Sequence, residues 1–314
     1  MIKIIFRRLL QLIVMGWSVS TLTFILMKLL GGNTAYRIAA GRYGDDGVTT
    51  AAANLVRQEL GLDQPVWLQY LHWLKDLAQL NLGKSFVSNA PIIDELSHQL
   101  SYTLVLAFSA LVIAAIIALP FGTWLGISNN KFLDKCSLFV SIFLRAQPVF
   151  CVGLILIFVF ALDLHWLPVA GFSRPEHLIL PAFTLALTLA AVSNRVVASS
   201  THDVLRSGYF QFARMKGLSL SQAYRAHGVR NIAMPVVAFM GVQLISLIEG
   251  VIMIESLFAW PGIGHALSHA VFSRDLPMLQ GAAFFFGIAF VSLNTVIDLC
   301  CYWLNPRGQR EIYQ

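Results

Sequence analysis

The chain has 314 residues, of which 57% are hydrophobic and only 12% are Asp, Glu, Lys or Arg, with a formal net charge of +6. Soluble globular chains carry about 25% charged residues, so this share is too small to cover a water-facing surface of that size. The composition excludes an ordinary soluble enzyme, a disordered chain and a binder of nucleic acid built on basic stripes. It predicts an all-α polytopic membrane protein.

Six segments are long and apolar enough to cross a bilayer core of about 30 Å, which needs about 20 helical residues. A cleaved signal peptide is the alternative for the first, but no small-x-small cleavage site precedes Gly31-Gly32 and we expect a retained helix. The predicted spans are Leu9–Leu30, Thr103–Ile127, Leu138–Leu162, Leu178–Ala198, Ala233–Ile254 and Leu276–Trp303. The chain then divides into a tail (1–8), the first span (9–30), an insertion (31–101), a five-span core (102–304) and a second tail (305–314).

The insertion is expected to be a small helical unit. Asp63-Gln64-Pro65 predicts the start of a helix, with Asp63 as its cap and Pro65 in the first turn, and Asn81-Leu82-Gly83 predicts its end. The apolar side chains between them repeat at helical spacing and give one apolar face: Trp67, Tyr70, Leu71, Leu74 and Ala78. We expect this helix to lie against the membrane or to cap the bundle.

The basic residues predict the orientation, because short cytoplasmic loops of membrane proteins are rich in Lys and Arg. The short loops on the opposite side hold only Arg174 and Arg274. With the N-terminus inside, the inner segments collect Lys3, Arg7, Arg8, Lys131, Lys135, Arg206, Arg214, Lys216, Arg225, Arg230, Arg307 and Arg310. Both termini are therefore expected to be cytoplasmic, and the insertion to lie on the outer side.

The sequence offers no catalytic motif. Leu82-Gly83-Lys84-Ser85 resembles the tail of a phosphate-binding loop, but Ala78 stands where that loop needs its first Gly, and a helix rather than a strand is predicted before it. No HExxH or GxSxG motif occurs, and the four cysteines lack metal-site spacing. We expect neither an enzymatic activity nor a bound cofactor.

The loop between the fourth and fifth predicted spans (about 200–232) is the most informative stretch. It reads as a helix, a stop at Gly217 with a left-handed cap, a short helix capped by Ser219, and Pro235 near the next span. Five positive charges lie between Arg206 and Arg230. One interpretation is a basic loop held near anionic headgroups; the other is a rigid elbow that receives a partner.

The residues of this loop resemble the EAA loop of ATP-binding-cassette importer permeases, in the version of the peptide/nickel family. The resemblance rests on A-R-x-K-G-L-S from Ala213 to Ser219 and H-x-x-R-N-x-x-x-P from His227 to Pro235. Other stretches are similar to that family in the same order: Gly61-Leu62-Asp63-Gln64-Pro65, Trp166-Leu167-Pro168, the run from Glu255 to Gly264, Arg274-Asp275-Leu276-Pro277 and Asn305-Pro306-Arg307.

The resemblance implies a permease subunit of a bacterial inner membrane, embedded in lipid and without an ATPase of its own. Its implied partners are two ATPase subunits, a second, different permease and a periplasmic substrate-binding protein. Gln211 and Phe212 depart from the family pattern, which has an acid and a small residue there. The residues implied to form the ATPase-coupling loop are Ala213, Arg214, Lys216, Gly217, Leu218, Ser219, Tyr224, His227, Arg230, Asn231 and Pro235.

Polar residues within the predicted spans are candidates for the translocation pathway, because intramembrane charge is costly. Arg145 and Gln147 precede Pro148, which should kink its helix, and Glu249 could pair with Arg145. The alternative for Arg145 is snorkelling to the membrane edge.

His265 and His269 are four residues apart, so on a helix their imidazoles share one side and could hold a metal ion. The alternative is a pair of ordinary polar residues in an outer loop. The chain resembles the nickel-type first permease in the stretches 166–181 and 270–275, so nickel or a metal chelate is the expected cargo and di- or oligopeptides are the alternative. A secondary transporter and a membrane-embedded enzyme are the rivals from other classes.

Overall fold

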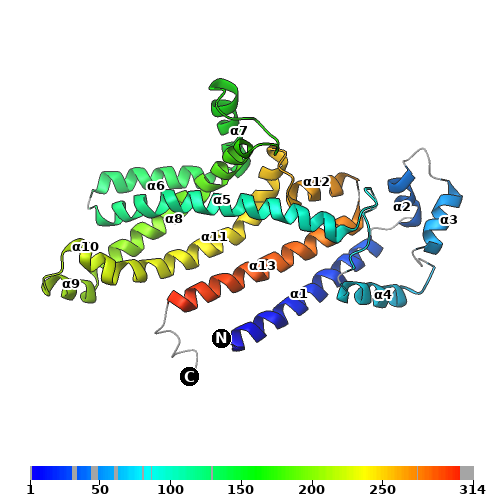
Figure 1. Cartoon of the computed structure of the whole chain (residues 1–314), viewed down its shortest axis with the longest axis horizontal. Helices are drawn as coiled ribbons and strands as arrows, with labels where there is room; N and C mark the ends of the chain where they lie inside the picture. Colours follow the sequence, from blue (N-terminus) through cyan, green and yellow to red (C-terminus); the bar gives the residue numbers. More distant parts are fainter. Residues whose placement is uncertain are drawn as a thin grey trace. The chain divides into compact units, whose positions relative to one another are not determined.

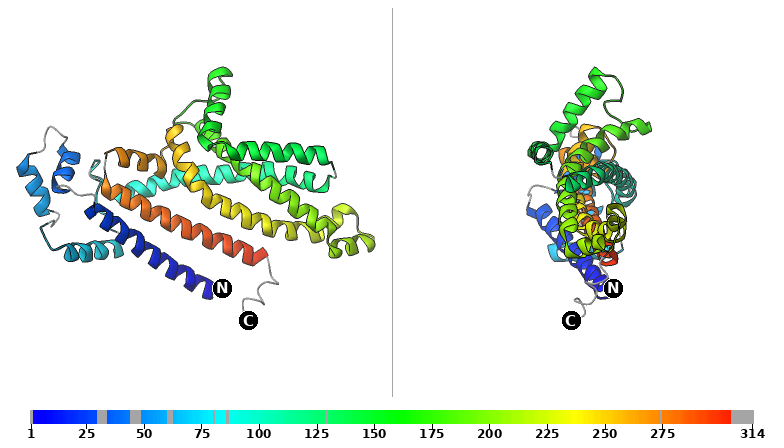
Figure 2. Two further views of the ribbon diagram at one scale, coloured as in Figure 1. Left: turned by 180° about the vertical axis from the view of Figure 1, so that it is seen from behind. Right: turned by 90° about the vertical axis from the view of Figure 1, so that its left-hand side faces the viewer.

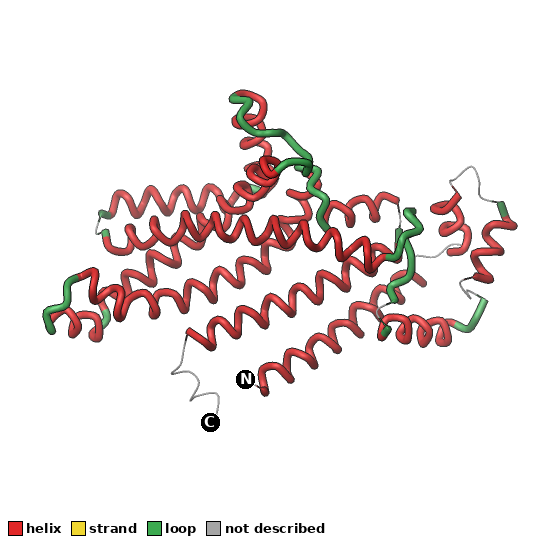
Figure 3. Tube along the Cα trace, viewed as in Figure 1, coloured by secondary structure: helices red, strands yellow, loops and turns green. Residues whose placement is uncertain are grey.

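The computed structural model describes residues 2–29, 34–43, 49–59, 63–79, 81–85, 87–128, 130–273 and 275–304. Within these residues the chain consists of helices and loops (Figure 3), with one isolated bridge between Lys84 and Pro91 and no strand. The predicted all-α class is confirmed. The motif residues Gly61, Leu62, Arg274 and Asn305–Arg307, and the predicted tail 305–314, lie outside the described residues.

The helices form two compact units, Met1–Tyr102 with Pro261–Ser292 and Thr103–Trp260 with Leu293–Gln314. The first unit contains α1 (Ile2–Leu29), α2 (Thr34–Tyr43), α3 (Thr50–Glu59), α4 (Val66–Ala78) and α12 (Ile263–Ser273). Two long helices, α5 (Ile92–Ile127) and α13 (Leu276–Leu304), each begin in the first unit and end in the second.

A buried apolar cluster holds the first unit together. It joins the start of α5, α12 and the start of α13, with its members Leu82, Ile92, Leu96, Ile263, Ala270, Met278 and Ala282. Gly281 allows α13 to approach α5, since a Cβ at this position would lie 2.6 Å from the Ile92 side chain. Beside α1 lies α4, whose Tyr70 hydroxyl is 2.8 Å from Thr21 Oγ1.

The predicted insertion is helical, as expected, but the cap of its last helix was wrongly assigned. The residue before α4 is Pro65, with φ −53° and ψ 140°, and no side chain caps the helix. Asp63 instead forms an ion pair with Arg57 at 3.7 Å. The cap prediction failed because Pro65, two residues further on, fixes the backbone from which the first turn starts.

In the second unit, α8 (Ile179–Arg206) is the central helix. It packs against α6 (Lys131–Ala146), α7 (Val149–Leu156) and α11 (Val229–Leu257) (Figure 1). It also lies very close to α5: a Cβ on Gly122 would lie 2.6 Å from Val197 Cβ, and one on Gly126 would lie 2.6 Å from the Ala198 carbonyl oxygen. Two glycines four residues apart allow such close approach of backbones in membrane helices.

The third predicted span, Leu138–Leu162, is two helices rather than one kinked helix. The axes of α6 and the following α7 with its π-helical end η2 (Ile157–Asp163) differ by 102°, and Figure 1 shows α7 turning away from α6. The break falls at Gln147-Pro148, where proline removes a backbone donor and clashes with the preceding turn. Pro148 therefore separates two helices, and does not merely kink one.

The predicted six membrane crossings are confirmed only in part. Among the described residues, Phe6–Leu26, Ile92–Ile127, Pro175–Arg206 and Pro277–Leu304 are long and apolar enough to cross a membrane, and the bent pair Lys131–Ala146 with Val149–Asp163 makes up to five. The 29-residue α11 covers the predicted fifth span but is not among these helices. A crossing by α11 stays a prediction.

Candidate functional site

The loop between α8 and α11 folds as the sequence predicts. Helix α9 (Gly208–Met215) ends at Lys216, Gly217 takes a left-handed φ of +90°, and α10 (Leu220–Ala223) follows. Ser219 and Gln222 form a reciprocal capping box, in which the Ser219 hydroxyl accepts from the Gln222 N–H and the Gln222 side chain accepts from the Ser219 N–H. We call residues 207–228 the elbow, which lies at the end of α8 and α11 (Figure 2).

The inner side of the elbow is fixed to the helices by an apolar cluster. Phe210 and Ala213 of α9 and Ala223 of α10 are buried against side chains of α8 and α11. The full buried set is Val197, Val204, Phe210, Ala213, Ala223, Ile232 and Val236. Because two of its short helices contribute to a common core, the elbow moves with α8 and α11 rather than as a free loop.

The outer side of the elbow exposes apolar and basic side chains together. Met215 is 78% exposed and Phe212 54% exposed, and the Lys216 ammonium lies 4.7 Å from the centre of the Phe212 ring. The Arg214 guanidinium donates to the Leu218 carbonyl at 3.1 Å, across the turn at Gly217. This surface, defined by Phe212, Met215, Arg214 and Lys216, is suited to a partner that covers apolar area and carries negative charge.

Two further contacts join the end of the elbow and the first turn of α11 to other helices. A π-helical turn, η4 (Tyr224–Gly228), brings the Tyr224 ring over Gly228, where a Cβ would lie 3.0 Å from the ring; its hydroxyl is 3.5 Å from Thr123 Oγ1 of α5. The guanidinium of Arg230 donates to the carbonyls of Leu304 at 3.1 Å and Trp303 at 3.4 Å, the last of α13.

Three other residues predicted for the coupling loop are Asn231, Pro235 and Leu218, which lie in or beside α11 and the apolar cluster. The Asn231 side chain, in the first turn of α11, donates to the His227 carbonyl of the preceding η4 turn at 2.6 Å. Pro235 lies inside α11, six residues after its start at Val229, and is exposed. Leu218 is half-buried and packs on the apolar cluster.

Of the three predicted pathway residues, the structure describes the side chains of Arg145 and Gln147. Arg145 is exposed in the last turn of α6 and Gln147 is exposed at the corner before α7. Glu249 lies in α11, but its side chain is not among those that the structure describes. A pair between Arg145 and Glu249 stays a prediction.

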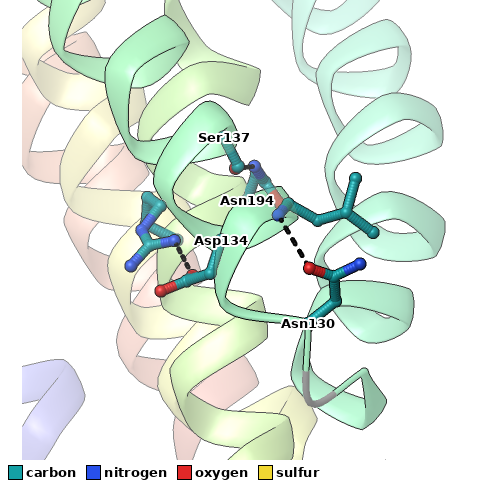
Figure 4. A network of polar contacts seen from close by, with 6 residues as sticks. Asn130, Asp134, Ser137 and Asn194 are labelled. Atoms are coloured by element: carbon teal, nitrogen blue, oxygen red, sulfur yellow. Dashed lines mark hydrogen bonds and ion pairs between the residues drawn. The ribbon is translucent and has the colours of Figure 1, made fainter.

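Instead, polar contacts that the sequence did not reveal join α6 to α8 (Figure 4). Arg195 of α8 donates to Asp134 of α6 at 2.5 Å, and the Asn194 amide donates to Ser137 Oγ at 2.9 Å. Arg195 is half-buried and paired. Asp134 and Ser137 are three residues apart on α6, a spacing that places them on one face, but nothing local identifies their partners on α8.

A second unpredicted contact involves a carboxyl group of the family-like stretch before the last span. Glu255 in α11 is fully buried, and the Thr103 hydroxyl of α5 donates to its Oε1 at 2.6 Å. The Glu255 carbonyl also accepts from the Trp260 N–H at 2.8 Å, which closes the end of the helix. A buried carboxyl group needs such partners, so this contact fixes α5 to α11.

His265 and His269 lie on one side of α12, as predicted, with ring centres 4.7 Å apart in an edge-on arrangement. Burial, and secondarily repulsion by His269, lowers the pKa of His265. The described residues include no group of three or more His, Cys, Asp or Glu that could hold a metal ion. The expected metal contact therefore has two candidate ligands there and no third.

Comparison with known proteins identifies the family. Residues 118–310 match the family described as binding-protein-dependent transport system inner membrane component, and residues 1–107 match its N-terminal counterpart. The chain belongs to this family. It is thus a multi-pass inner-membrane component of a transport system. This confirms the predicted permease of a binding-protein-dependent importer, apart from its cargo.

Relatives of this permease cover nearly its full length. It is 37% identical over 306 residues to the glutathione transport system permease protein GsiC of Escherichia coli K12, which covers 98% of each chain. The corresponding protein of Shigella boydii serotype 4 is 36% identical over the same share. An amino acid ABC transporter solved with histidines has a TM-score of 0.51 at 16% identity, covering 67% of this chain and 94% of that one, which supports the fold.

Proposed function

We propose that the chain is the membrane-spanning subunit of an ATP-driven importer whose cargo is glutathione or another short peptide. The observation that carries this proposal is the full-length similarity to permeases named for glutathione transport. Glutathione is a tripeptide, so the relatives favour the peptide alternative over the nickel interpretation. Among the described residues no third metal ligand accompanies His265 and His269, so this pair gives nickel no independent support.

In this proposal the elbow receives the ATPase. Its outer side offers exposed apolar area beside Arg214 and Lys216, and its inner side is packed on α8 and α11. A rigid body anchored to several helices transmits a displacement, whereas a flexible loop would absorb it. The basic residues of the inner segments support a cytoplasmic position for the elbow and both termini, on the side where ATP is available.

The proposed assembly contains two ATPase subunits, a second and different permease subunit, and an external binding protein. This chain contributes the pathway and the elbow, and the partners contribute ATP hydrolysis and capture of the cargo. The family description, a component of a binding-protein-dependent system, supports the presence of partners in general.

Uptake tests the proposal directly. Cells that lack the chain and cells that carry it are given labelled glutathione, a labelled tripeptide or labelled nickel at equal concentrations. We expect uptake of the peptides to depend on the chain. If only nickel uptake depended on the chain, the metal interpretation would be favoured again. Transport by the purified chain without ATPase subunits would support a secondary transporter.

A further inference from the structure

The first unit contains a cavity of about 350 Å³ that the transport proposal does not yet use. It is lined by the loop before α5, the first turns of α5, α12 with the two residues before it, and the start of α13 with the residue before it. The lining polar side chains are Ser85, Ser88, Glu95, His98, Gln99, His265, His269 and Asp275. Ligand pockets range from about 300 to 1,000 Å³, so this one suits a small group or one end of a larger molecule.

The charge of the cavity is negative. Glu95 and Asp275 line it, and none of the described lining residues is Lys or Arg. The N-termini of α5, α12 and α13 each contribute about half a positive charge, which against two carboxylates leaves the cavity negative by about half a charge. Asp275 is used internally, because it accepts from Ser85 Oγ and from the Met278 N–H, so Glu95 supplies the charge available to a ligand.

The cavity is also rich in hydrogen-bond acceptors. The Glu95 carboxylate receives one bond, from Ser88 Oγ at 3.1 Å, and has capacity for more. The Oε1 of Gln99, a lining residue, has no hydrogen-bond partner within the described part of the chain and is closed to solvent in this conformation. Such an acceptor is costly unless a donor reaches it, and rotation of the amide into the cavity would bring it to a ligand donor. A metal ion is disfavoured, since no three suitable ligands converge among the described residues.

We propose that this cavity binds the terminal ammonium group of a peptide cargo, with Glu95 as its charge partner and Gln99 Oε1 as an acceptor. An ammonium group carries three donors and one positive charge on a compact centre, which matches the two features above. The inference rests on the proposed peptide function. It adds a chemical preference within the permease itself.

The test uses the complete importer in proteoliposomes and compares uptake of tri-alanine with that of N-acetyl-tri-alanine. In the wild type we expect the free amine to have the lower KM. Glu95→Gln should raise the KM of tri-alanine about tenfold, which corresponds to about 1.4 kcal/mol, and should leave the acetylated peptide unchanged. Gln99→Met should act in the same direction. The same binding protein serves the wild type and the variants, so its own preference between the two peptides cancels when the variants are compared with the wild type.

Asp94→Asn is the matched control, because Asp94 is exposed in the same first turn of α5 and does not line the cavity. It should leave both KM values unchanged. An equal change for both peptides, or no change, overturns the ammonium site. A weaker affinity for the binding protein with unchanged discrimination also overturns it, in favour of a partner side chain. Wild-type liposomes that take up neither peptide refute the proposed function as well, so the two failures are distinguishable.

Discussion

The close contact between α5 and α8 makes Gly126→Ala a sharp test of the packing in the second unit. A Cβ at position 126 would lie 2.6 Å from the Ala198 carbonyl oxygen and 2.6 Å from Thr201 Cβ. Ordinary contact begins at about 3.5 Å, so the two helices must separate by about 0.9 Å or distort. The obstacle includes backbone, which cannot rotate away as a side chain could. Overpacking of this kind costs about 1–3 kcal/mol.

The assay is SDS-induced unfolding of the purified protein, followed by tryptophan fluorescence. The matched control is Gly208→Ala, since Gly208 opens α9 and a Cβ there meets nothing within 4 Å. We expect the free energy of unfolding to fall for Gly126→Ala and to stay level or rise slightly for the control. Equal unfolding curves for the two variants would refute the inferred helix contact.

Three further outcomes follow from the structure. Gly217→Val should reduce co-purification of the ATPase subunits, because φ of +90° strains a β-branched residue; Gly83→Val, also at positive φ with open space around it, should not. Asp275→Ala should lower the free energy of unfolding by about 1–3 kcal/mol through loss of a helix cap and a buried acceptor, while Asp275→Asn, which keeps an acceptor, should lose less. Because the pKa of His265 is lowered, stability should fall as pH drops below about 6.5. Melting temperatures between pH 5 and 8 should show this in the wild type and in the exposed-site control His72→Gln, and less of it in His265→Gln.

The elbow was predictable from sequence because its signals are local. Gly217 and Ser219 determine a helix end and a helix start by their own backbone and side-chain chemistry, and the structure confirms both. The spacing of His265 and His269 likewise predicted a shared helix face. The functional roles of the elbow residues stay predictions.

Features that depend on distant partners could not be predicted. Hydropathy located the apolar part of α5, from Thr103 onward, and missed that the helix begins at Ile92, because its first turns are polar. Pro148 predicted a kink, but the 102° corner depends on how α7 packs on α8 and α11. The Glu255–Thr103 contact joins helices far apart in sequence, and no local pattern encodes such a pairing.

The bonds from Arg230 to the last carbonyls of α13 have a practical consequence for handling the protein. Removing the carboxyl end from Trp303 onward would delete both acceptors. The start of α11, directly after the elbow, would then lose its contact with α13, even though the cut lies far from it in sequence. An affinity tag joined after residue 304 keeps both oxygens in place. Loss of transport after the cut before Trp303, with transport kept after a cut that follows Leu304, would therefore identify these hydrogen bonds as the cause.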